Sequence, residues 1–146
     1  MPLIITVPEQ YLKMTPGTCD RPVGLIDMYP TLVELCGLST NERIEGRSLV
    51  PLLKDSQAEW KHLTLTSYGP GNHALQSERY RFYQYEDGST ELYDQQSDPN
   101  EWINLASNPD HAKLIEEFRR SLPQSEAKSS KYNKYPTNRY FLKRFR

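Results

Sequence analysis

The side chains with the clearest potential for chemistry lie in GPGNHA, residues 69–74. An imidazole can exchange a proton near neutral pH, and the amide of Asn72 can both donate and accept hydrogen bonds. Gly69 and Gly71 favour a mobile loop that would present Asn72 and His73 to a ligand. A single histidine is also common as a solvated or hydrogen-bonded residue. Asn72 and His73 are therefore candidate substrate-binding residues, with a structural His73 as the alternative.

Four carboxylates allow a metal site or a general base, but they fit a structural role better. Asp27 stands at the start of an apolar helical pattern, where aspartate most often caps a turn or pairs with a cation. Asp94, Asp98 and Glu101 could together bind calcium, but their spacing matches no twelve-residue calcium loop. Asp-Pro-Asn at 98–100 is ordinary turn chemistry. We therefore predict turns rather than metal ligation at these positions.

The candidate nucleophiles lack the partners that catalysis requires. Cys19 and Cys36 have no accompanying histidine pair, which favours unbridged thiols over a zinc site. A single disulfide between them is the alternative in an oxidising compartment. Ser67 and Ser77 have no nucleophile-elbow motif around them. No catalytic set can be assembled from these residues, and the sequence predicts no metal site.

Residues 124–146 form an electrostatically distinct, tyrosine-rich tail. One acid, Glu126, stands among many cations: Lys128, Lys131, Lys134, Arg139, Lys143, Arg144 and Arg146. Aromatic residues alternate with these cations, a combination that suits phosphate contact and base stacking. A basic extension that is solvated or lies on an acidic surface explains the same composition. No RNA-binding signature accompanies the tail, so we favour that extension and expect no nucleic-acid partner.

Composition limits the remaining possibilities. The 146 residues are 36% hydrophobic and 25% charged, which fits one globular domain. The longest apolar run, Leu3 to Val7, has the length of a strand and is far shorter than the ~18 residues of a membrane span. Met1 precedes this run without the charged segment or cleavage site of an export signal. The sequence as it stands predicts a soluble chain with no membrane contact.

The first half of the chain predicts one strand and one helix. PLIITVP, residues 2–8, is a β-branched apolar run typical of a buried strand. VGLIDMYPTLVELCGL, residues 23–38, has apolar residues broadly at helical spacing. Pro30 should open the main helix after a tighter turn, and Gly37 should end it. An irregular segment with an apolar anchor follows at residues 43–55.

The second half predicts a small antiparallel meander and a covering helix. LTLTS, HALQS, RYRFYQY and TELYD are short runs separated by turn residues. Asp87-Gly88 is the strongest hairpin signal, since glycine takes the positive φ of a tight turn. Phe82 and Tyr83 should point to opposite faces, which indicates a sheet covered on both sides. A helix should begin near Pro109, with Asn108 as its N-cap, and stop at Pro123.

Three of these segments, in this order, resemble the C-terminal third of the sulfatase family. They are residues 23–38, EGRSLVPLL at 45–53, and SERYRFYQYEDGSTELYDQQSDPNEWINLA at 77–106. Within the alkaline-phosphatase-like superfamily the chain is most similar to iduronate-2-sulfatase-like members. The resemblance implies an α/β fold: residues 1–59 as the last strand and helix of the α/β core, and residues 60–123 as a small four-stranded antiparallel subdomain with a C-terminal helix. Residues 124–146 would be an added tail.

The resemblance also implies that the catalytic centre lies outside this chain. Sulfatases hydrolyse sulfate esters with a formylglycine made in a Cys/Ser-x-Pro-x-Arg motif, beside a calcium ion. Neither Cys19 nor Cys36 stands in such a motif. The resemblance therefore implies a sulfatase portion that is inactive alone and whose partner is the N-terminal catalytic region. It further implies sulfated carbohydrate substrates and a periplasmic or secreted bacterial enzyme.

One loop matches a position near the active site of the family. Asn72-His73-Ala74 resembles a loop that approaches the mouth of the active site in iduronate-sulfatase-like members. The resemblance therefore supports Asn72 and His73 as candidate substrate-binding residues. Gln76 stands where relatives often carry arginine, so this strand has lost a cation for anionic sugars.

Three functions remain open from sequence alone. The first is a piece of a sulfatase. The apolar run at residues 3–7 favours it, because this strand would be left unpaired and exposed in an independent protein, which would be expected to carry charged residues there. The second is a stand-alone remnant that binds a glycan or another partner. The third is an anion or nucleic-acid binder acting through the tail, which would show a steep salt dependence.

Overall fold

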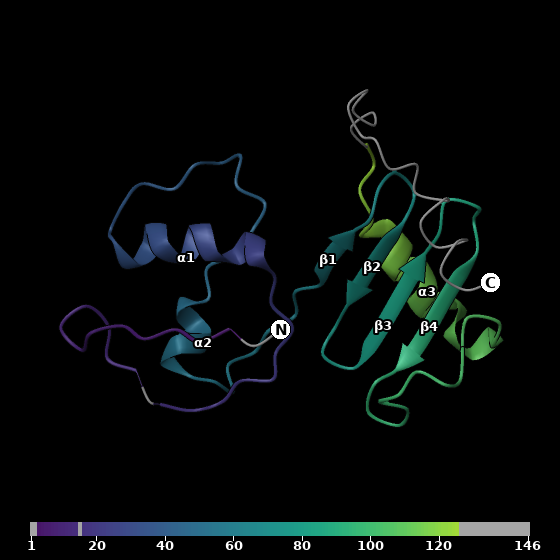
Figure 1. The fold of residues 1–146 in the computed structure, drawn as a ribbon, viewed down its shortest axis with the longest axis horizontal. Helices are drawn as coiled ribbons and strands as arrows, with labels where there is room; N and C mark the ends of the chain where they lie inside the picture. Colours follow the sequence, from purple (N-terminus) through teal and green to yellow (C-terminus); the bar gives the residue numbers. More distant parts are fainter. Residues whose placement is uncertain (1–2, 15, 126–146) are drawn as a thin grey trace, which may run out of the picture. The chain divides into compact units, whose positions relative to one another are not determined.

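A computed structural model describes residues 3–14 and 16–125 of the chain (Figure 1). The chain divides into two compact units, Met1–Thr64 and Leu65–Arg146. The predicted basic tail falls almost wholly outside the described residues. Each unit packs around side chains of its own, so each is described separately.

The helical part of the first unit follows the prediction closely. A turn of 3-10 helix, η1 (Leu25–Asp27), leads directly into α1 (Met28–Leu35). Pro30 is the third residue of α1 rather than its first. The first N–H groups of a helix have no intrahelical acceptor, so a proline there costs no hydrogen bond. Gly37 ends the helix with a φ of +63°, and the Leu38 amide donates to the Val33 carbonyl at 2.9 Å.

The strand predicted at residues 2–8 is not formed. Residues 3–7 have no regular secondary structure, and the described strands all belong to one four-stranded sheet elsewhere in the chain. A strand needs hydrogen bonds from a neighbouring strand, and the described residues offer none to this run. Ile5 still packs against the apolar cluster of the unit, while Ile4 is 87% exposed. Only part of this apolar run is therefore buried.

The apolar cluster of the first unit forms around α2 (Val50–Lys54). Leu49, Leu52 and Trp60 are buried together, with Ile5 and other half-buried side chains packed against them. The indole N–H of Trp60 donates to the Pro22 carbonyl at 3.0 Å, so this large ring is buried without an unpaired polar group. The predicted apolar anchor is confirmed for Leu49 and Leu52. The prediction that residues 43–55 are irregular is wrong for Val50–Lys54, which form α2.

The second unit contains the predicted meander. Its antiparallel strands follow one another in space in the order of the sequence: β1 (Thr64–Ser67), β2 (His73–Gln76), β3 (Tyr80–Gln84) and β4 (Thr90–Asp94). The turn between β3 and β4 uses Gly88 at φ +84°, and the Gly88 amide donates to the Tyr85 carbonyl at 2.9 Å. The Asp-Gly signal therefore located this hairpin correctly.

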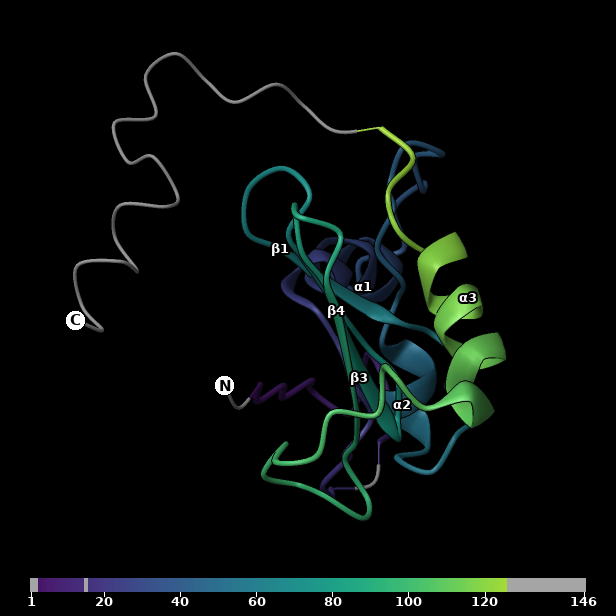
Figure 2. The ribbon, with the colours of Figure 1, turned by 90° about the vertical axis from the view of Figure 1, so that its right-hand side faces the viewer.

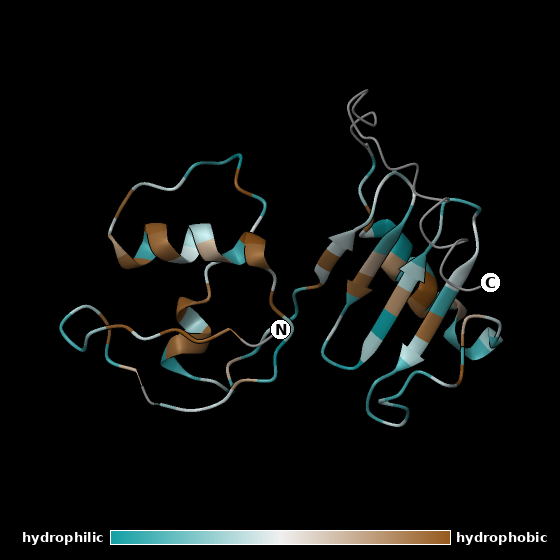
Figure 3. Cartoon of the chain, in the orientation of Figure 1, coloured by the Kyte–Doolittle hydropathy of each residue, from teal (hydrophilic) through white to brown (hydrophobic). Residues whose placement is uncertain are grey.

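One face of the sheet is covered by α3 (Ala112–Arg120), as Figure 2 shows. A short 3-10 turn, η2 (Pro109–His111), precedes α3, and the Asn108 side chain caps it by accepting from the Asp110 amide at 3.0 Å. Leu75, Phe82 and Leu92 are fully buried beneath the helix. Bands of hydrophobic residues alternate with hydrophilic ones along the strands, as this one-sided burial requires (Figure 3).

The helix ends sooner than predicted, and the other face of the sheet differs from the prediction. α3 stops at Arg120, before Pro123 is reached. On the face opposite α3 the side chains of Arg81, Tyr83 and Tyr85 are half-buried. No helix or strand in the described part of the second unit covers this face, and the loop that follows β4 extends on this side (Figure 2). The described residues therefore cover this face only in part, through Glu101 of that loop, which bonds Arg81 and Tyr83.

Candidate functional site

His73 is the first residue of β2 and is only 8% exposed. Its Nδ1 atom and the Ser67 hydroxyl oxygen are 2.8 Å apart, which links the ends of β1 and β2. Because side chains alternate along a strand, His73 shares its face with buried Leu75. This environment corresponds to the structural interpretation of His73. Contact between His73 and a substrate remains a prediction.

Asn72 lies in the β1–β2 loop and is more accessible than His73. Its side-chain N–H group donates to the Pro70 carbonyl at 2.8 Å, and its side-chain oxygen accepts from the Glu86 amide at 3.4 Å. A Cβ atom on Gly71 would lie 2.9 Å from the Glu86 Cα atom, so this loop approaches the β3–β4 turn closely. The loop predicted to be mobile is thus held by contacts to the next hairpin.

Asp27 has the structural role that the sequence favoured. The side chain is 8% exposed, and its two oxygens accept from the Gly24 amide at 2.7 Å and from the Arg47 amide at 2.8 Å. Its backbone carbonyl accepts from the Thr31 hydroxyl at 2.6 Å. One carboxylate therefore ties the start of the helix to the segment near Arg47, with both of its oxygens accepting backbone hydrogen bonds.

The carboxylates after β4 also take part in turns. The Asp98 amide donates to the Asp94 carbonyl at 2.8 Å, and the Glu101 amide donates to the Asp98 carbonyl at 3.1 Å. The carboxylates themselves have different partners: Asp94 pairs with Arg79, Asp98 accepts from the Ile103 amide, and Glu101 points back to the sheet. The predicted turn is confirmed.

Replacing Asp94 by asparagine should lower stability by about 1–2 kcal/mol at neutral pH. Arg79 binds both carboxylate oxygens, at 2.7 and 3.1 Å, and these bonds hold the Asp94 pKa well below its ordinary value. The pair therefore stabilises the fold fully above about pH 4, and this contribution is lost as the pH falls through the lower pKa of the folded state. Thermal unfolding of both proteins across this range measures the difference.

The control for this experiment is Arg79→Gln, which removes the other partner. The difference in Tm between wild type and either variant should be largest near pH 7 and should become smaller in acid. The double variant should have nearly the same Tm as either single variant. A gap of constant size at every pH would show that the charge pair is not its cause.

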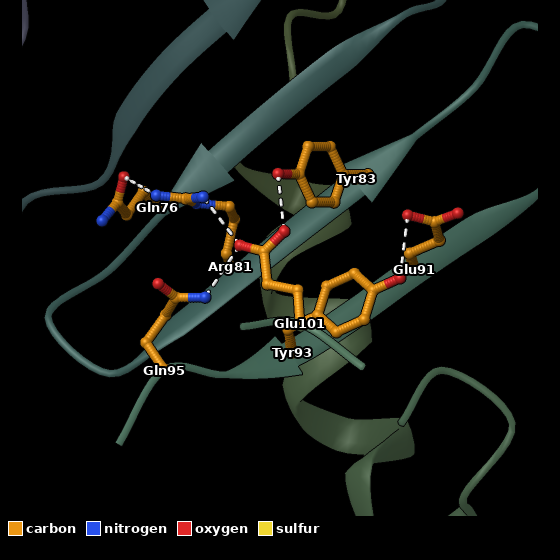
Figure 4. A network of polar contacts seen from close by, with 7 residues as sticks. All are labelled: Gln76, Arg81, Tyr83, Glu91, Tyr93, Gln95 and Glu101. Carbon is orange, nitrogen blue, oxygen red and sulfur yellow. Dashed lines mark hydrogen bonds and ion pairs between the residues drawn. The ribbon is translucent and has the colours of Figure 1, made fainter. Parts of the chain in front are cut away.

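A polar network covers the sheet face opposite α3 (Figure 4). Glu101 is at its centre: one oxygen accepts from Arg81 at 2.7 Å and from the Gln95 amide group at 2.8 Å. The second oxygen accepts from the Tyr83 hydroxyl at 3.2 Å. Arg81 also donates to the Gln76 side-chain oxygen at 3.1 Å, so the residue that replaces the expected arginine has a partner of its own.

Tyrosines extend this network along β3 and β4. The Tyr93 hydroxyl donates to Glu91 at 3.2 Å, and the rings of Tyr83 and Tyr93 meet edge to face with centroids 6.1 Å apart. Burial, aided by nearby Glu91, raises the pKa of Tyr85 to about 12. Burial also raises the pKa values of Tyr83 and Tyr93. All three phenols therefore remain neutral hydrogen-bond donors at physiological pH.

Only part of this network could be found in the sequence. Strand alternation places Arg81 and Tyr83 on one face, but Glu101 is far from both along the chain. Its backbone has a φ of +57°, which glycine and asparagine adopt far more readily than glutamate, so no local preference points to this conformation. The network is assembled by tertiary packing.

Among residues 3–14 and 16–125, no group of three or more His, Cys, Asp or Glu side chains is placed to hold a metal ion. Cys19 is followed by Asp20, Arg21 and Pro22, and Cys36 is an exposed free thiol. No helix within the described part of the chain has the length and apolar character to cross a membrane.

Comparison with known proteins gives a consistent result. A family profile described as N-sulphoglucosamine sulphohydrolase, C-terminal, matches residues 1–128. A curated "Sulfatase" of Formosa agariphila is 41% identical over 123 residues, covering 84% of this chain and 24% of its own length. A Delta 4,5-hexuronate-2-O-sulfatase of Bacteroides thetaiotaomicron is 32% identical over 104 residues, covering 64% of this chain and 21% of its own length.

Solved structures agree with the fold. A structure described as a 2-O GAG sulfatase matches with a TM-score of 0.51 and 28% identity, covering 65% of this chain and 22% of that one. A structure described as Ps i-CgsB in complex with k-i-k-neocarrahexaose matches with a TM-score of 0.57 and 19% identity, covering 69% of this chain and 23% of that one. At this identity the match supports the fold alone. The chain spans about a quarter of the length of the relatives it matches.

Proposed function

The chain belongs to the sulfatase family as a C-terminal domain, and from this premise we propose that it completes a sulfuric ester hydrolase that acts on sulfated carbohydrates. The observation that carries the proposal is the family match over residues 1–128, together with the sheet-and-helix fold shared with solved sulfatases. Relatives named for 2-O-sulfated substrates support an iduronate-2-sulfatase-like specificity.

The proposed partner is the N-terminal catalytic region of a sulfatase. Its support is the exposed apolar surface of the first unit. Leu25, Tyr29 and Leu32 lie on one side of η1 and α1 and are 66%, 62% and 56% exposed. Ile4 is 87% exposed in the run that pairs with no strand. Exposed apolar side chains that gather on one side of a helix mark interaction surfaces, so we assign residues 1–59 to the end of the α/β core.

The chain is proposed to be inactive by itself. Hydrolysis of a sulfate ester requires a nucleophile and positive groups that stabilise the developing negative charge. In the described residues of the second unit, the carboxylates of Asp94, Glu101 and Glu116 are each paired with an arginine. The cation Arg81 is bound to Glu101 and Gln76. The N-terminal region would have to supply formylglycine, calcium and the sulfate-binding groups.

Asn72 and His73 are retained as proposed substrate contacts, with Asn72 the better placed of the two. Asn72 is half-buried in the loop, whereas His73 would have to leave Ser67 to reach a ligand. A stand-alone module that binds a glycan or a partner is the second candidate function, supported by the half-buried tyrosines on the sheet face opposite α3. A periplasmic or secreted location is proposed by analogy with the family.

Mixing this chain with the N-terminal region of the Formosa agariphila relative should restore sulfatase activity. That region is the part of the relative outside its match to this chain, and it would be prepared with its formylglycine and with calcium present. We expect neither part alone to release sulfate from a 2-O-sulfated unsaturated uronate disaccharide, and the mixture to release it at least about tenfold faster. Sulfate release measured by ion chromatography gives the rates.

Two further samples make the result specific. The intact relative sets the rate of a complete enzyme, and an aryl sulfate tests activity independently of the sugar. Sulfate release by this chain alone would contradict the proposal that it is inactive. Cleavage of the aryl sulfate but not of the uronate by the mixture would keep the sulfatase role and overturn the proposed specificity.

A further inference from the structure

The loop between β4 and η2 presents an exposed apolar pair, Trp102 and Ile103. Their side chains are 82% and 64% exposed, and they are adjacent in sequence. Tryptophan is among the residues most often buried at the centre of protein interfaces. We propose that Trp102 and Ile103 form a docking point that inserts into an apolar pocket on the N-terminal region of a sulfatase, an inference that rests on the proposed function.

The loop that presents this pair is held by its own hydrogen bonds. The Ile103 amide donates to the Asp98 carboxylate at 2.8 Å. On the far side, the Asn104 side-chain oxygen accepts from the Leu92 amide at 3.1 Å and from the Ala106 amide at 2.9 Å. Both ends of the exposed pair are therefore tied to the fold. A contact surface fixed before binding loses less conformational entropy when a partner arrives.

Glu101 adds a constraint directly beside the pair. Its φ of +57° is a costly conformation for a residue with a side chain, and such strain persists only where the surroundings impose it. Here Arg81, Tyr83 and Gln95 all bind the Glu101 carboxylate, which turns it onto the sheet (Figure 4). The next residue, Trp102, remains almost fully exposed. The network on the sheet face thus anchors the loop while Trp102 stays available.

The chemistry around the pair favours a protein pocket over a sugar. A saccharide that stacks on a tryptophan also needs polar groups beside the ring for its hydroxyls. The polar side chains flanking the pair, Glu101 and Asn104, direct their oxygens to Arg81 and to backbone amides. The apolar neighbour Ile103 completes a surface suited to a hydrophobic pocket.

The N-terminal region is the occupant that the family match supports. Trp102 and Ile103 fall inside residues 1–128, the part matched by the sulfatase C-terminal profile. The curated relatives carry about three quarters of their length outside the segment matched to this chain. A large surface of the same enzyme is therefore expected to contact this domain.

The test measures the affinity of this chain for the N-terminal region of the Formosa agariphila relative by calorimetry. Replacing both Trp102 and Ile103 by alanine should raise the Kd about 30-fold, the loss typical of a tryptophan hot spot. Trp102→Phe keeps an aromatic ring and should lose far less. Gln96→Ala changes an exposed polar side chain of the same loop and should leave the Kd within about twofold. Hydroxyl-radical footprinting should show Trp102 protected in the complex.

Each outcome decides the inference. Unchanged affinity of the double variant, with unchanged thermal unfolding, would overturn the docking point and leave the proposed function standing. Failure of the wild-type chain to bind would overturn both. Binding of a neutral or sulfated oligosaccharide that depends on Trp102, without an effect on the protein complex, would overturn the inference in favour of a glycan contact.

Discussion

Replacing Phe82 by alanine should destabilise the sheet of the second unit by about 3–5 kcal/mol. Phe82 is 0% exposed and stacks on Phe118 of α3 with ring centroids 5.5 Å apart. The cavity would open between Leu75, Leu92 and the helix, so β3 and α3 would lose their common contact. Total stabilities of single domains are about 5–15 kcal/mol, so this loss takes a large share of the stability. Denaturant unfolding followed by circular dichroism measures it.

Two variants of β3 separate packing from other effects. Phe82→Leu keeps most of the apolar volume but loses the stacked ring, and should cost about 1–2 kcal/mol. Gln84→Ala changes a half-buried side chain of the same strand and should cost less than about 1 kcal/mol. Similar losses for Phe82→Ala and Gln84→Ala would show that the face covered by α3 is not the main core of this unit.

Gly46→Ala should disrupt the first unit, with an expected loss of about 3 kcal/mol or more. A Cβ atom on Gly46 would lie 2.2 Å from the Ile26 carbonyl oxygen and 2.6 Å from the Ile26 carbonyl carbon. Both atoms belong to the backbone, so no side chain can rotate away to relieve the contact. The shift would also move Arg47, whose amide binds the buried Asp27 carboxylate at 2.8 Å.

The matched control for Gly46 is Gly24. A Cβ atom on Gly24 would be 3.4 Å from its nearest neighbour, the Thr64 side chain, which is an ordinary contact distance. Gly24→Ala should therefore change stability by less than about 1 kcal/mol. Fluorescence of Trp60, which is buried with Leu49 and Leu52, reports unfolding of this unit. Equal unfolding midpoints for the two alanine variants would show that the segment near Gly46 can shift freely.

Local signals in the sequence located the elements of the second unit. Period-two alternation and the Asp-Gly turn placed β2, β3 and β4, because these features depend on residues close along the chain. Asn108 gave the start of the final helical segment in the same way. The strand predicted at residues 2–8 was wrong, because a strand requires a neighbour and the described chain does not provide one.

The exposure of the candidate site residues could not be predicted from such local signals. The sequence presented His73 as the residue for a ligand, and folding placed it at 8% exposure beside Ser67. It gave no sign that Glu101 would reach Arg81 and Tyr83, or that Trp102 would remain exposed next to it. These outcomes depend on contacts between residues that are distant in sequence, and one sequence records no such pairing.

The sequence by itself determined the order of the strands and their turns, since both depend on residue types at close local spacing. Its resemblance to the sulfatase family pointed to the family that the profile match shows. Only the tertiary structure decided which face of the sheet α3 buries, how Asp27 and Glu101 use their charges, and which apolar side chains remain exposed. The physical reason is that burial and ion pairing depend on which segments, distant in sequence, come into contact. Many local patterns are compatible with more than one set of such contacts.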